Sequence, residues 1–353
     1  MFAVVACLLG FALAAGIAEI GLRVYVSSRG WTPNCYATGA VFFVPDDRTG
    51  HTLRPGLHLK SSAFDVQVNS LGFRGPEIDL NKPKGTRRIA VLGGSSVFGY
   101  LVPTGKCSCR DLEAALMKQS DIQNAGIDRI EVINAGVPGF NLTQCIGRME
   151  NQVAPLKPDI VLLYLGWNDI PCLITQGESD HTPPAPPVSE RFLAHSTLYG
   201  FLRYRLFPPP APKFAPPQSA AAQIVPAAAD RFRSDLKAMI AIIRTAGAVP
   251  VISTQVMAAD DRCVSLDRYL GDTPQQIEHN RQLGQWVANQ LREAALQQGV
   301  HLIDTARLVP CDDQILGDAI HLTAHGHQLV AEAWADELVP LLLEASVAEV
   351  HAP

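Results

Sequence analysis

Hydrophobic positions in this chain follow two different periods that alternate from about residue 87 onward. Arg88–Leu92 and Asp159–Leu165 are continuous apolar runs, as is typical of strands buried on both faces. Ala229–Ala246 and Thr273–Gln298 instead repeat apolar residues at helical spacing. The same two patterns predict further strands at Ile130–Ile133, Val249–Ser253 and His301–Ile303, and further helices at Arg110–Lys118, Leu142–Val153 and Thr323–Leu343. Strands that alternate with helices predict a three-layer, doubly wound α/β domain around a parallel sheet.

The N-terminus begins with an apolar segment. Residues Phe2–Ala18 contain no charge, and Phe2–Leu22 is long enough, at roughly 1.5 Å per helical residue, to cross a hydrocarbon core of about 30 Å. A cleaved signal peptide, with Ala12-Leu13-Ala14 as its cleavage site, is the alternative. The chain lacks a basic start, and the apolar run continues beyond that site. We therefore expect residues 1–24 to form an uncleaved, single-pass transmembrane anchor.

The sequence does not establish on which side of the membrane the main domain lies. Arg23 and Arg29 follow the apolar segment, which by the positive-inside tendency favours a cytoplasmic domain, but that tendency is weak for long domains. A disulfide such as Cys263–Cys311 is an alternative outside the cytoplasm, although spacing cannot establish pairing. Buried free thiols are the interpretation that we favour for the eight cysteines. Our working expectation is an extracytoplasmic, periplasmic domain.

Composition shifts divide the rest of the chain. Residues 25–86 are rich in Gly and Pro, with an extended piece at Phe64–Val68, and we interpret them as an N-terminal extension of the main domain at 87–345. A proline-dense insertion at about 171–226 interrupts the α/β pattern, with an aromatic segment at Tyr199–Phe207. The insertion could form a lid or substrate-binding wall, and a surface spacer is the alternative. Residues 346–353 form a tail.

Charge and metal-ligand patterns exclude other classes of function. The chain has 29 Lys and Arg against 34 Asp and Glu without a basic stripe, so we expect no nucleic-acid partner. Cys107 and Cys109 have no second pair at zinc-ribbon spacing. His321, His325 and His327 are the alternative metal cluster, but no Glu stands between the first two as in H-E-x-x-H. We therefore expect neither a metal nor a cofactor.

Four short segments carry candidate chemistry, each at the end of a predicted strand or at the start of a helix. They are Gly93–Gly99 (GGSSVFG), Asn134–Gly139 (NAGVPG), Gly166–Asp169 (GWND) and Asp318–His321 (DAIH). Because the carboxyl ends of parallel strands meet at one edge of a sheet, we expect these segments to converge there.

Acyl transfer needs an activated hydroxyl, a base and donors for the developing oxyanion. Ser95 is the candidate nucleophile, and its N–H, the N–H of Gly139 and the side-chain amide of Asn168 are the candidate oxyanion donors. His321 is the candidate base, and Asp318, three residues earlier, would orient it. Taken singly, each residue also fits a turn, a cap or a solvated loop. Their order along the chain favours the catalytic interpretation.

With these segments in place, residues 87–345 resemble the SGNH (GDSL-type) serine hydrolases. The resemblance implies the SGNH hydrolase fold, a flavodoxin-like five-stranded parallel sheet, with Ser95, Asp318 and His321 as the triad and Ser95, Gly139 and Asn168 as the oxyanion hole. Gly94 departs from the usual Gly-Asp-Ser block.

The Gly-Gly-Ser block that results is similar to that of a membrane-anchored bacterial subgroup, as is the stretch Asn69–Gly75 (NSLGFRG). Within that stretch we expect Arg74 to form a surface ion pair, with contact to an anionic substrate as the alternative.

These observations predict a membrane-anchored serine esterase that hydrolyses or transfers a small acyl group. An O-acetyl group on a polysaccharide is the substrate that relatives of this fold suggest. A catalytically silent glycan-binding or assembly protein on the same fold is the alternative from another class. A nucleotide-binding protein using the Gly93–Gly99 loop is the weakest alternative, because the loop has neither G-x-G-x-x-G spacing nor a P-loop lysine.

Overall fold

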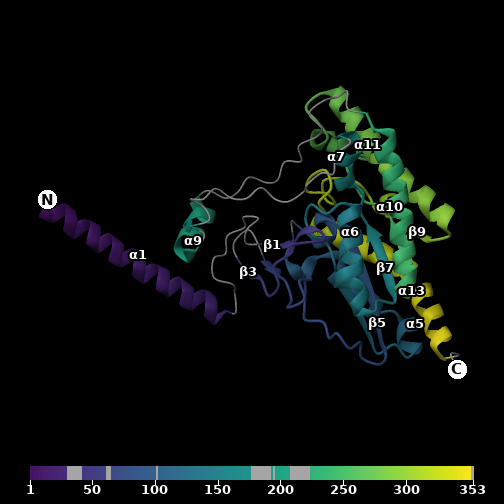
Figure 1. Cartoon of the computed structure of the whole chain (residues 1–353), viewed down its shortest axis with the longest axis horizontal. Coiled ribbons are helices and arrows are strands. Elements are labelled where there is room, and N and C mark those ends of the chain that lie inside the picture. Colours follow the sequence, from purple (N-terminus) through teal and green to yellow (C-terminus); the bar gives the residue numbers. More distant parts are fainter. Residues whose placement is uncertain are drawn as a thin grey trace.

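A parallel five-stranded sheet forms the centre of the chain (Figure 1). The computed structural model describes residues 1–29, 42–60, 65–100, 102–175, 192–193, 195–206 and 223–350. The five strands are β5 (Thr86–Gly93), β6 (Arg129–Asn134), β7 (Ile160–Tyr164), β8 (Val249–Ser253) and β9 (His301–Ile303), in the spatial order β6-β5-β7-β8-β9. Numbered along the chain this order is 2-1-3-4-5, the flavodoxin-like arrangement. The predicted fold class is confirmed.

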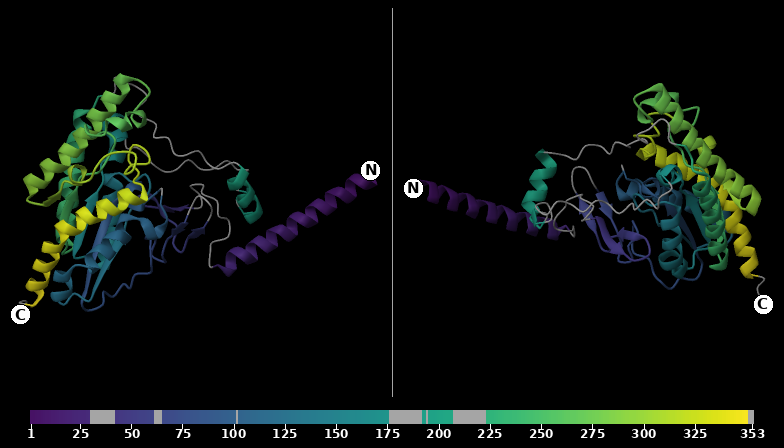
Figure 2. Two further views of the ribbon diagram at one scale, coloured as in Figure 1. Left: turned by 180° about the vertical axis from the view of Figure 1, so that it is seen from behind. Right: turned by 45° about the horizontal axis from the view of Figure 1, so that its top comes forward.

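Helices cover both faces of this sheet, so its central strands are buried throughout. The packed helices are α4 (Ser108–Met117) and α13 (Ala324–Val350) on one face, and α6 (Leu142–Arg148), α10 (Pro226–Thr245) and α11 (Pro274–Gln298) on the other (Figure 2). Shorter helices are α3 (Ser95–Phe98), α5 (Ser120–Asn124), α7 (Ile170–Thr175), α9 (Thr197–Leu206) and α12 (Thr305–Leu308). The three predicted layers are therefore present.

Helix ends follow the capping chemistry of the sequence. The Thr273 side chain accepts a hydrogen bond from the backbone N–H of Gln276, and the Gln276 side chain accepts one from the backbone N–H of Thr273. Helix α11 therefore starts with a capping box. The helix expected over Leu142–Val153 instead divides into α6 and a π-helical turn, Met149–Val153. That turn lies just before Pro155, whose ring nitrogen cannot donate the next backbone hydrogen bond.

The N-terminal segment forms one long helix, α1 (Phe2–Ser28). By length and apolar composition this helix could cross a membrane, although a signal sequence near an N-terminus has the same features. Its side chains are exposed up to Ala14, several from Ala15 to Val26 are partly or fully buried, and it contacts α9 (Figure 1). Glu19 accepts hydrogen bonds from the N–H groups of Thr197 and Leu198, at 2.9 and 2.7 Å. Helix α1 thus caps the start of a helix in the insertion.

Residues 42–85 pack against the sheet domain through two hairpins. These pair β1 (Phe43–Asp46) with β2 (Gly50–Leu53) and β3 (His58–Lys60) with β4 (Asp65–Gln67). Their apolar residues belong to the same core as the sheet, and Leu53 and Leu59 are fully buried. The proline-dense stretches 183–187 and 208–217 lie outside the described residues, so the interpretations of the insertion as a lid or a spacer stay predictions.

One cysteine expectation needs correction. Cys263 and Cys311 form a disulfide, with Cα atoms 5.2 Å apart, so the free thiols that we favoured are wrong for this pair. The pair closes a loop that includes all of α11, and only the folded positions of β8 and α12 bring the two ends together. Cys107, Cys109, Cys145 and Cys172 form no disulfide.

Candidate active site

The predicted nucleophile lies where β5 ends. Ser95 is the first residue of α3, a four-residue helix that follows Gly93 and Gly94 directly. The hydroxyl of Ser95 lies 2.7 Å from Nε2 of His321, 226 residues away in the chain. Both side chains are partly buried, so the pair is shielded yet reachable from solvent.

Asp318 completes a continuous hydrogen-bonded row. Its Oδ2 lies 2.7 Å from Nδ1 of His321, and its Oδ1 accepts the N–H groups of Ile320 and His321 at 3.0 and 2.8 Å. Burial alone would raise the pKa of Asp318, but these bonds and the nearby imidazole outweigh it and hold the pKa below its usual value. The carboxylate therefore stays ionised and keeps the imidazole proton on Nδ1, which leaves Nε2 facing the Ser95 hydroxyl.

The three predicted oxyanion donors also gather here. Gly139 has φ +87°, a backbone conformation that glycine adopts without strain. Within the described part of the chain, neither the N–H of Ser95 nor that of Gly139 has an acceptor. The Asn168 amide donates one hydrogen to the carbonyl of Phe140 at 2.9 Å and has a second hydrogen to offer. The Asn168 amide and the turn that follows Gly139 thus lie beside Gly94, the residue before Ser95.

Gly94 shows how closely these loops approach one another. A Cβ atom at this position would lie 2.4 Å from Nδ2 of Asn168 and 3.3 Å from the carbonyl oxygen of Phe140. The Asn168 amide therefore occupies the space that any larger residue would need. The glycine that departs from the usual Gly-Asp-Ser block leaves the Asn168 amide this space, and a larger residue would have to displace it. Asp169 links the same loops, since its Oδ1 accepts the N–H of Leu142 at the start of α6.

Two supporting residues were missed by sequence reasoning. Ser96 is buried, and its hydroxyl donates to the carbonyl of Ile320 at 3.1 Å, next to the His321 side chain. Tyr100 packs its ring against the His321 imidazole, with centroids 5.2 Å apart. Burial, and then the charge of Asp318, raise the pKa of Tyr100, so its phenol stays protonated. Their positions just after Ser95 were the only available signal.

The histidines of the alternative metal cluster point to different places. His325 is exposed, whereas His327 is buried and accepts the N–H of Ser108 at Nδ1, at 3.1 Å. Burial, and then the charges of Arg74 and His321, lower the pKa of His327 to about 3, so this imidazole is neutral. Among the described residues, no group of three His, Cys, Asp or Glu side chains could hold a metal ion.

The surface ion pair and the substrate contact expected for Arg74 are both wrong. This side chain is only 1% exposed and donates to the carbonyls of Phe98, Gly99 and Val102. Its guanidinium also lies over the Phe98 ring, 4.5 Å from the centroid. The Arg74 guanidinium is thus bound by carbonyl oxygens and an aromatic ring rather than by a carboxylate. Arg74 therefore fastens the N-terminal extension to the chain that follows Ser95.

Comparison with known proteins gives a family match and distant structural neighbours. The model of the GDSL-like lipase/acylhydrolase family matches residues 91–329. No curated protein sequence matches the chain significantly. Similar solved structures include a lipase/acylhydrolase from Enterococcus faecalis, at 18% identity and a TM-score of 0.44, covering 72% of this chain and 96% of that one. An acetyl xylan esterase, AlAXEase, is 15% identical with a TM-score of 0.43, covering 70% and 98%.

The family match spans most of the chain and includes all the strands of the sheet except the first residues of β5. It also contains the four sequence segments with the candidate chemistry. The chain therefore belongs to the GDSL-like lipase/acylhydrolase family and is an enzyme that hydrolyses ester bonds.

Proposed function

We propose that this protein is a membrane-anchored serine esterase in which Ser95, His321 and Asp318 form the catalytic triad. The observation that carries the proposal is the unbroken row of hydrogen bonds from Asp318 through His321 to Ser95, with two distances of 2.7 Å. Ester hydrolysis requires a hydroxyl activated in this manner.

In the first half of the reaction, Oγ of Ser95 attacks the ester carbonyl carbon and its proton passes to Nε2 of His321. Asp318 keeps its charge and stabilises the imidazolium that forms. The carbonyl oxygen becomes an oxyanion held by the N–H groups of Ser95 and Gly139 and by the Asn168 amide. Collapse of this intermediate expels the alcohol, which takes its proton from His321.

In the second half, a water molecule attacks the acyl-enzyme while His321 again acts as the base. The acid is released and Ser95 is regenerated. A sugar hydroxyl in place of water would make the same enzyme a transferase. The partial exposure of the Ser95–His321 pair supports access by either acceptor.

The substrate that we propose is a small acyl ester, specifically an O-acetyl group on a polysaccharide. Crowding at the nucleophile favours a small acyl group, because Gly94, Phe140 and Asn168 are already in contact beside Ser95. A long acyl chain would need space that these loops occupy.

We further propose that α1 anchors the enzyme in a membrane, as in the membrane-anchored subgroup with a Gly-Gly-Ser block, and that the catalytic domain lies on the extracytoplasmic side. The length and apolar character of α1 support the anchor. The Cys263–Cys311 disulfide supports an oxidising compartment.

The experiment uses the full chain in detergent micelles and compares the wild type with Ser95→Ala. We expect the wild type to hydrolyse p-nitrophenyl acetate faster than longer-chain esters and to release acetate from an acetylated oligosaccharide. Ser95→Ala should lose at least about 10³-fold in kcat, because no other group can form the acyl-enzyme. A fluorophosphonate probe should label the wild type at Ser95. Absence of both labelling and hydrolysis would support the silent glycan-binding protein instead.

A further inference from the structure

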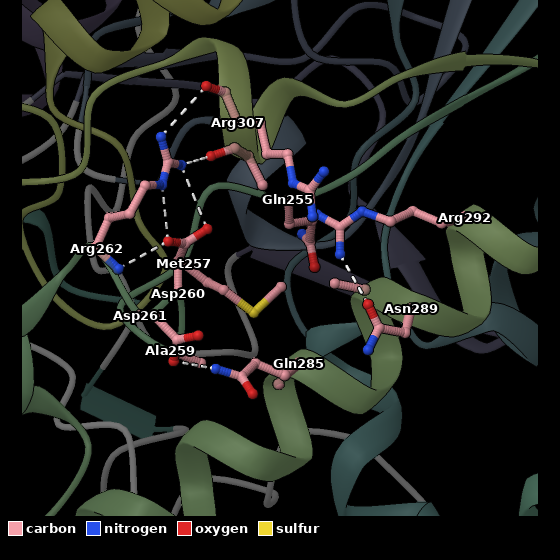
Figure 3. A pocket seen from close by; sticks show the side chains of 13 residues that line it. Gln255, Met257, Ala259, Asp260, Asp261, Arg262, Gln285, Asn289, Arg292 and Arg307 are labelled. Atoms are coloured by element: carbon pink, nitrogen blue, oxygen red, sulfur yellow. Dashed lines mark hydrogen bonds and ion pairs between the residues drawn. The ribbon is translucent and has the colours of Figure 1, made fainter.

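A cavity lies beside the catalytic loops, and none of the triad residues lines it. Its volume is about 510 Å³, within the range of roughly 300–1,000 Å³ that is usual for ligand sites. Residues 255–262, which follow β8, form one wall, α11 forms another, and Ala306 and Arg307 of α12 close the third (Figure 3).

One end of this cavity carries an excess of positive charge. Arg292 bonds both carboxylate oxygens of Asp304, at 2.9 and 3.0 Å, and Nε of Arg307 lies 3.5 Å from the same carboxylate. Two guanidinium groups therefore share one counter-charge. Arg307 is 71% exposed at its side chain, so its remaining N–H donors are available to a ligand.

The neighbouring Arg262 does not add to this excess. It pairs with Asp260 through both carboxylate oxygens and also donates to the carbonyls of Ala306 and Arg307. Figure 3 shows its guanidinium folded onto Asp260 and the α12 backbone. This pair is internally satisfied and closes one side of the cavity.

Two further side chains in the cavity present hydrogen-bond donors, and two others present acceptors. Gln255 uses its oxygen to accept the Trp167 N–H at 3.0 Å, and Asn289 uses its oxygen to accept from Arg292, also at 3.0 Å. The NH₂ groups of these two amides have no partner among the described residues, so both are donors toward the cavity. In Figure 3, Asp261 and Gln285 lie at the end away from Arg292 and Arg307 and present carboxylate and amide oxygens.

We propose that this cavity binds a small polyhydroxylated anion, such as a hexuronate or a sugar phosphate. The anionic group lies against Arg292 and Arg307, where charge-assisted bonds to planar guanidinium groups are strongest. The hydroxyl groups face Asp261 and Gln285, whose oxygens accept hydrogen bonds. Carboxylate and phosphate share this chemistry, and the two sources are separated by the ligands tested below.

The cavity wall also touches both catalytic loops. Gln255 holds the backbone of Trp167, the residue before Asn168, and the N–H of Ala258 donates to the carbonyl of Ala319 at 2.8 Å. Residues 255–259 thus lie between the ligand site and the loops that carry Asn168 and His321. Binding itself does not depend on the esterase mechanism.

The test is isothermal titration calorimetry on the full-length Ser95→Ala variant in detergent micelles, with glucuronate, glucose 6-phosphate and glucose as ligands. We expect one or both acids to bind at least about tenfold more tightly than glucose. Arg307→Ala should weaken the binding of that acid by at least about tenfold. The acid that binds more tightly identifies the carboxylate or the phosphate as the preferred group.

Arg129→Ala is the matched control, because Arg129 is also an exposed, ion-paired arginine but starts β6 at the opposite end of the sheet strands. Its ligand binding should equal that of the parent. Equal affinity for glucose and the acids, no binding of either acid, or acid binding that Arg307→Ala leaves unchanged would each overturn the proposal. Because Arg307 is exposed, its substitution should leave the thermal unfolding curve unchanged, and this measurement excludes a folding defect.

Discussion

The hydroxyl of Ser96 donates a hydrogen bond to the carbonyl of Ile320, at 3.1 Å and across 224 residues of sequence. The two residues are the immediate neighbours of Ser95 and His321. Because Ser96 is buried, water does not compete for this bond. The bond joins α3 to the loop of the catalytic base directly beside the 2.7 Å contact between Ser95 and His321. The Ser96–Ile320 bond therefore helps to fix the position of the Ser95 hydroxyl relative to the His321 imidazole.

We expect Ser96→Ala to lower kcat by about fivefold to tenfold, the equivalent of one net hydrogen bond of about 1 kcal/mol. The loss should fall on kcat rather than on KM, because the bond positions the reacting groups and does not touch the substrate. Steady-state kinetics with p-nitrophenyl acetate measure both constants.

Ser253→Ala is the control for this variant. Ser253 is equally buried and bonded, to Thr305 and Trp334, but it contacts neither Ser95 nor His321. Its removal should lower the melting temperature while the folded enzyme keeps its kcat. If Ser96→Ala has the same profile as Ser253→Ala, the hydroxyl is only a stabilising group.

Gly94 gives a second prediction. A methyl group at this position would lie 2.4 Å from Nδ2 of Asn168, so Gly94→Ala should push the proposed oxyanion donor out of place. We expect a loss of about 10²–10³ in kcat, as for removal of one oxyanion donor. Asn168→Ala should cost a similar factor, and the double variant little more than either, because both changes remove one interaction.

Gly105→Ala is the matched control, since its Cβ would have no atom within 4 Å. It should behave as the wild type. Fully additive losses in the Gly94→Ala, Asn168→Ala double variant would show that Gly94 acts through something other than the Asn168 amide.

The positions of Ser95, Gly139 and Asn168 at one edge could be predicted because strand ends of a parallel sheet share that edge. That inference needs only the order of strands and the residue type at each end. The bond from Ser96 to Ile320 and the packing of Tyr100 on His321 could not be predicted. They depend on side-chain directions that are fixed only when the loops are packed together.

Arg74 and the Cys263–Cys311 pair show a second limit. A lone arginine in a glycine-rich stretch is usually on the surface, and only the folded extension reveals that the carbonyls of Phe98, Gly99 and Val102 accept from this one. Cysteine spacing allows many pairings, and the fold of β8 and α12 selects one. Both features depend on contacts between segments that are distant in the sequence.

The disulfide leads to a prediction about compartment and stability. In intact cells, Cys263 and Cys311 should resist alkylation by a maleimide mass tag until a reductant is added, whereas Cys172, which is partly exposed and in no disulfide, should react without reductant. Replacing both cysteines by serine should lower the free energy of unfolding by about 4 kcal/mol, the chain-entropy value for a separation of 48 residues. Immediate alkylation of the pair in cells would contradict an extracytoplasmic domain.

The buried His327 leads to a prediction about stability in acid. Its pKa falls from an ordinary 6.5 to about 3, chiefly through burial, so the unfolded chain binds this proton more tightly than the folded protein. Stability should therefore be unaffected by His327 above pH 6.5 and decrease as the pH falls from 6.5 toward 3. Between pH 6.5 and 5 the single site should cost about 2 kcal/mol.

The measurement compares urea unfolding of the wild type and His327→Gln at pH 7 and pH 5. Glutamine does not titrate, and its side-chain oxygen can accept the Ser108 N–H that His327 now accepts. The variant should lose about 2 kcal/mol less than the wild type between the two pH values, whatever its stability at pH 7. His325→Gln, at an exposed position two residues away, should keep the wild-type slope. Equal slopes for the wild type and His327→Gln would mean that the buried imidazole accepts a proton without unfolding.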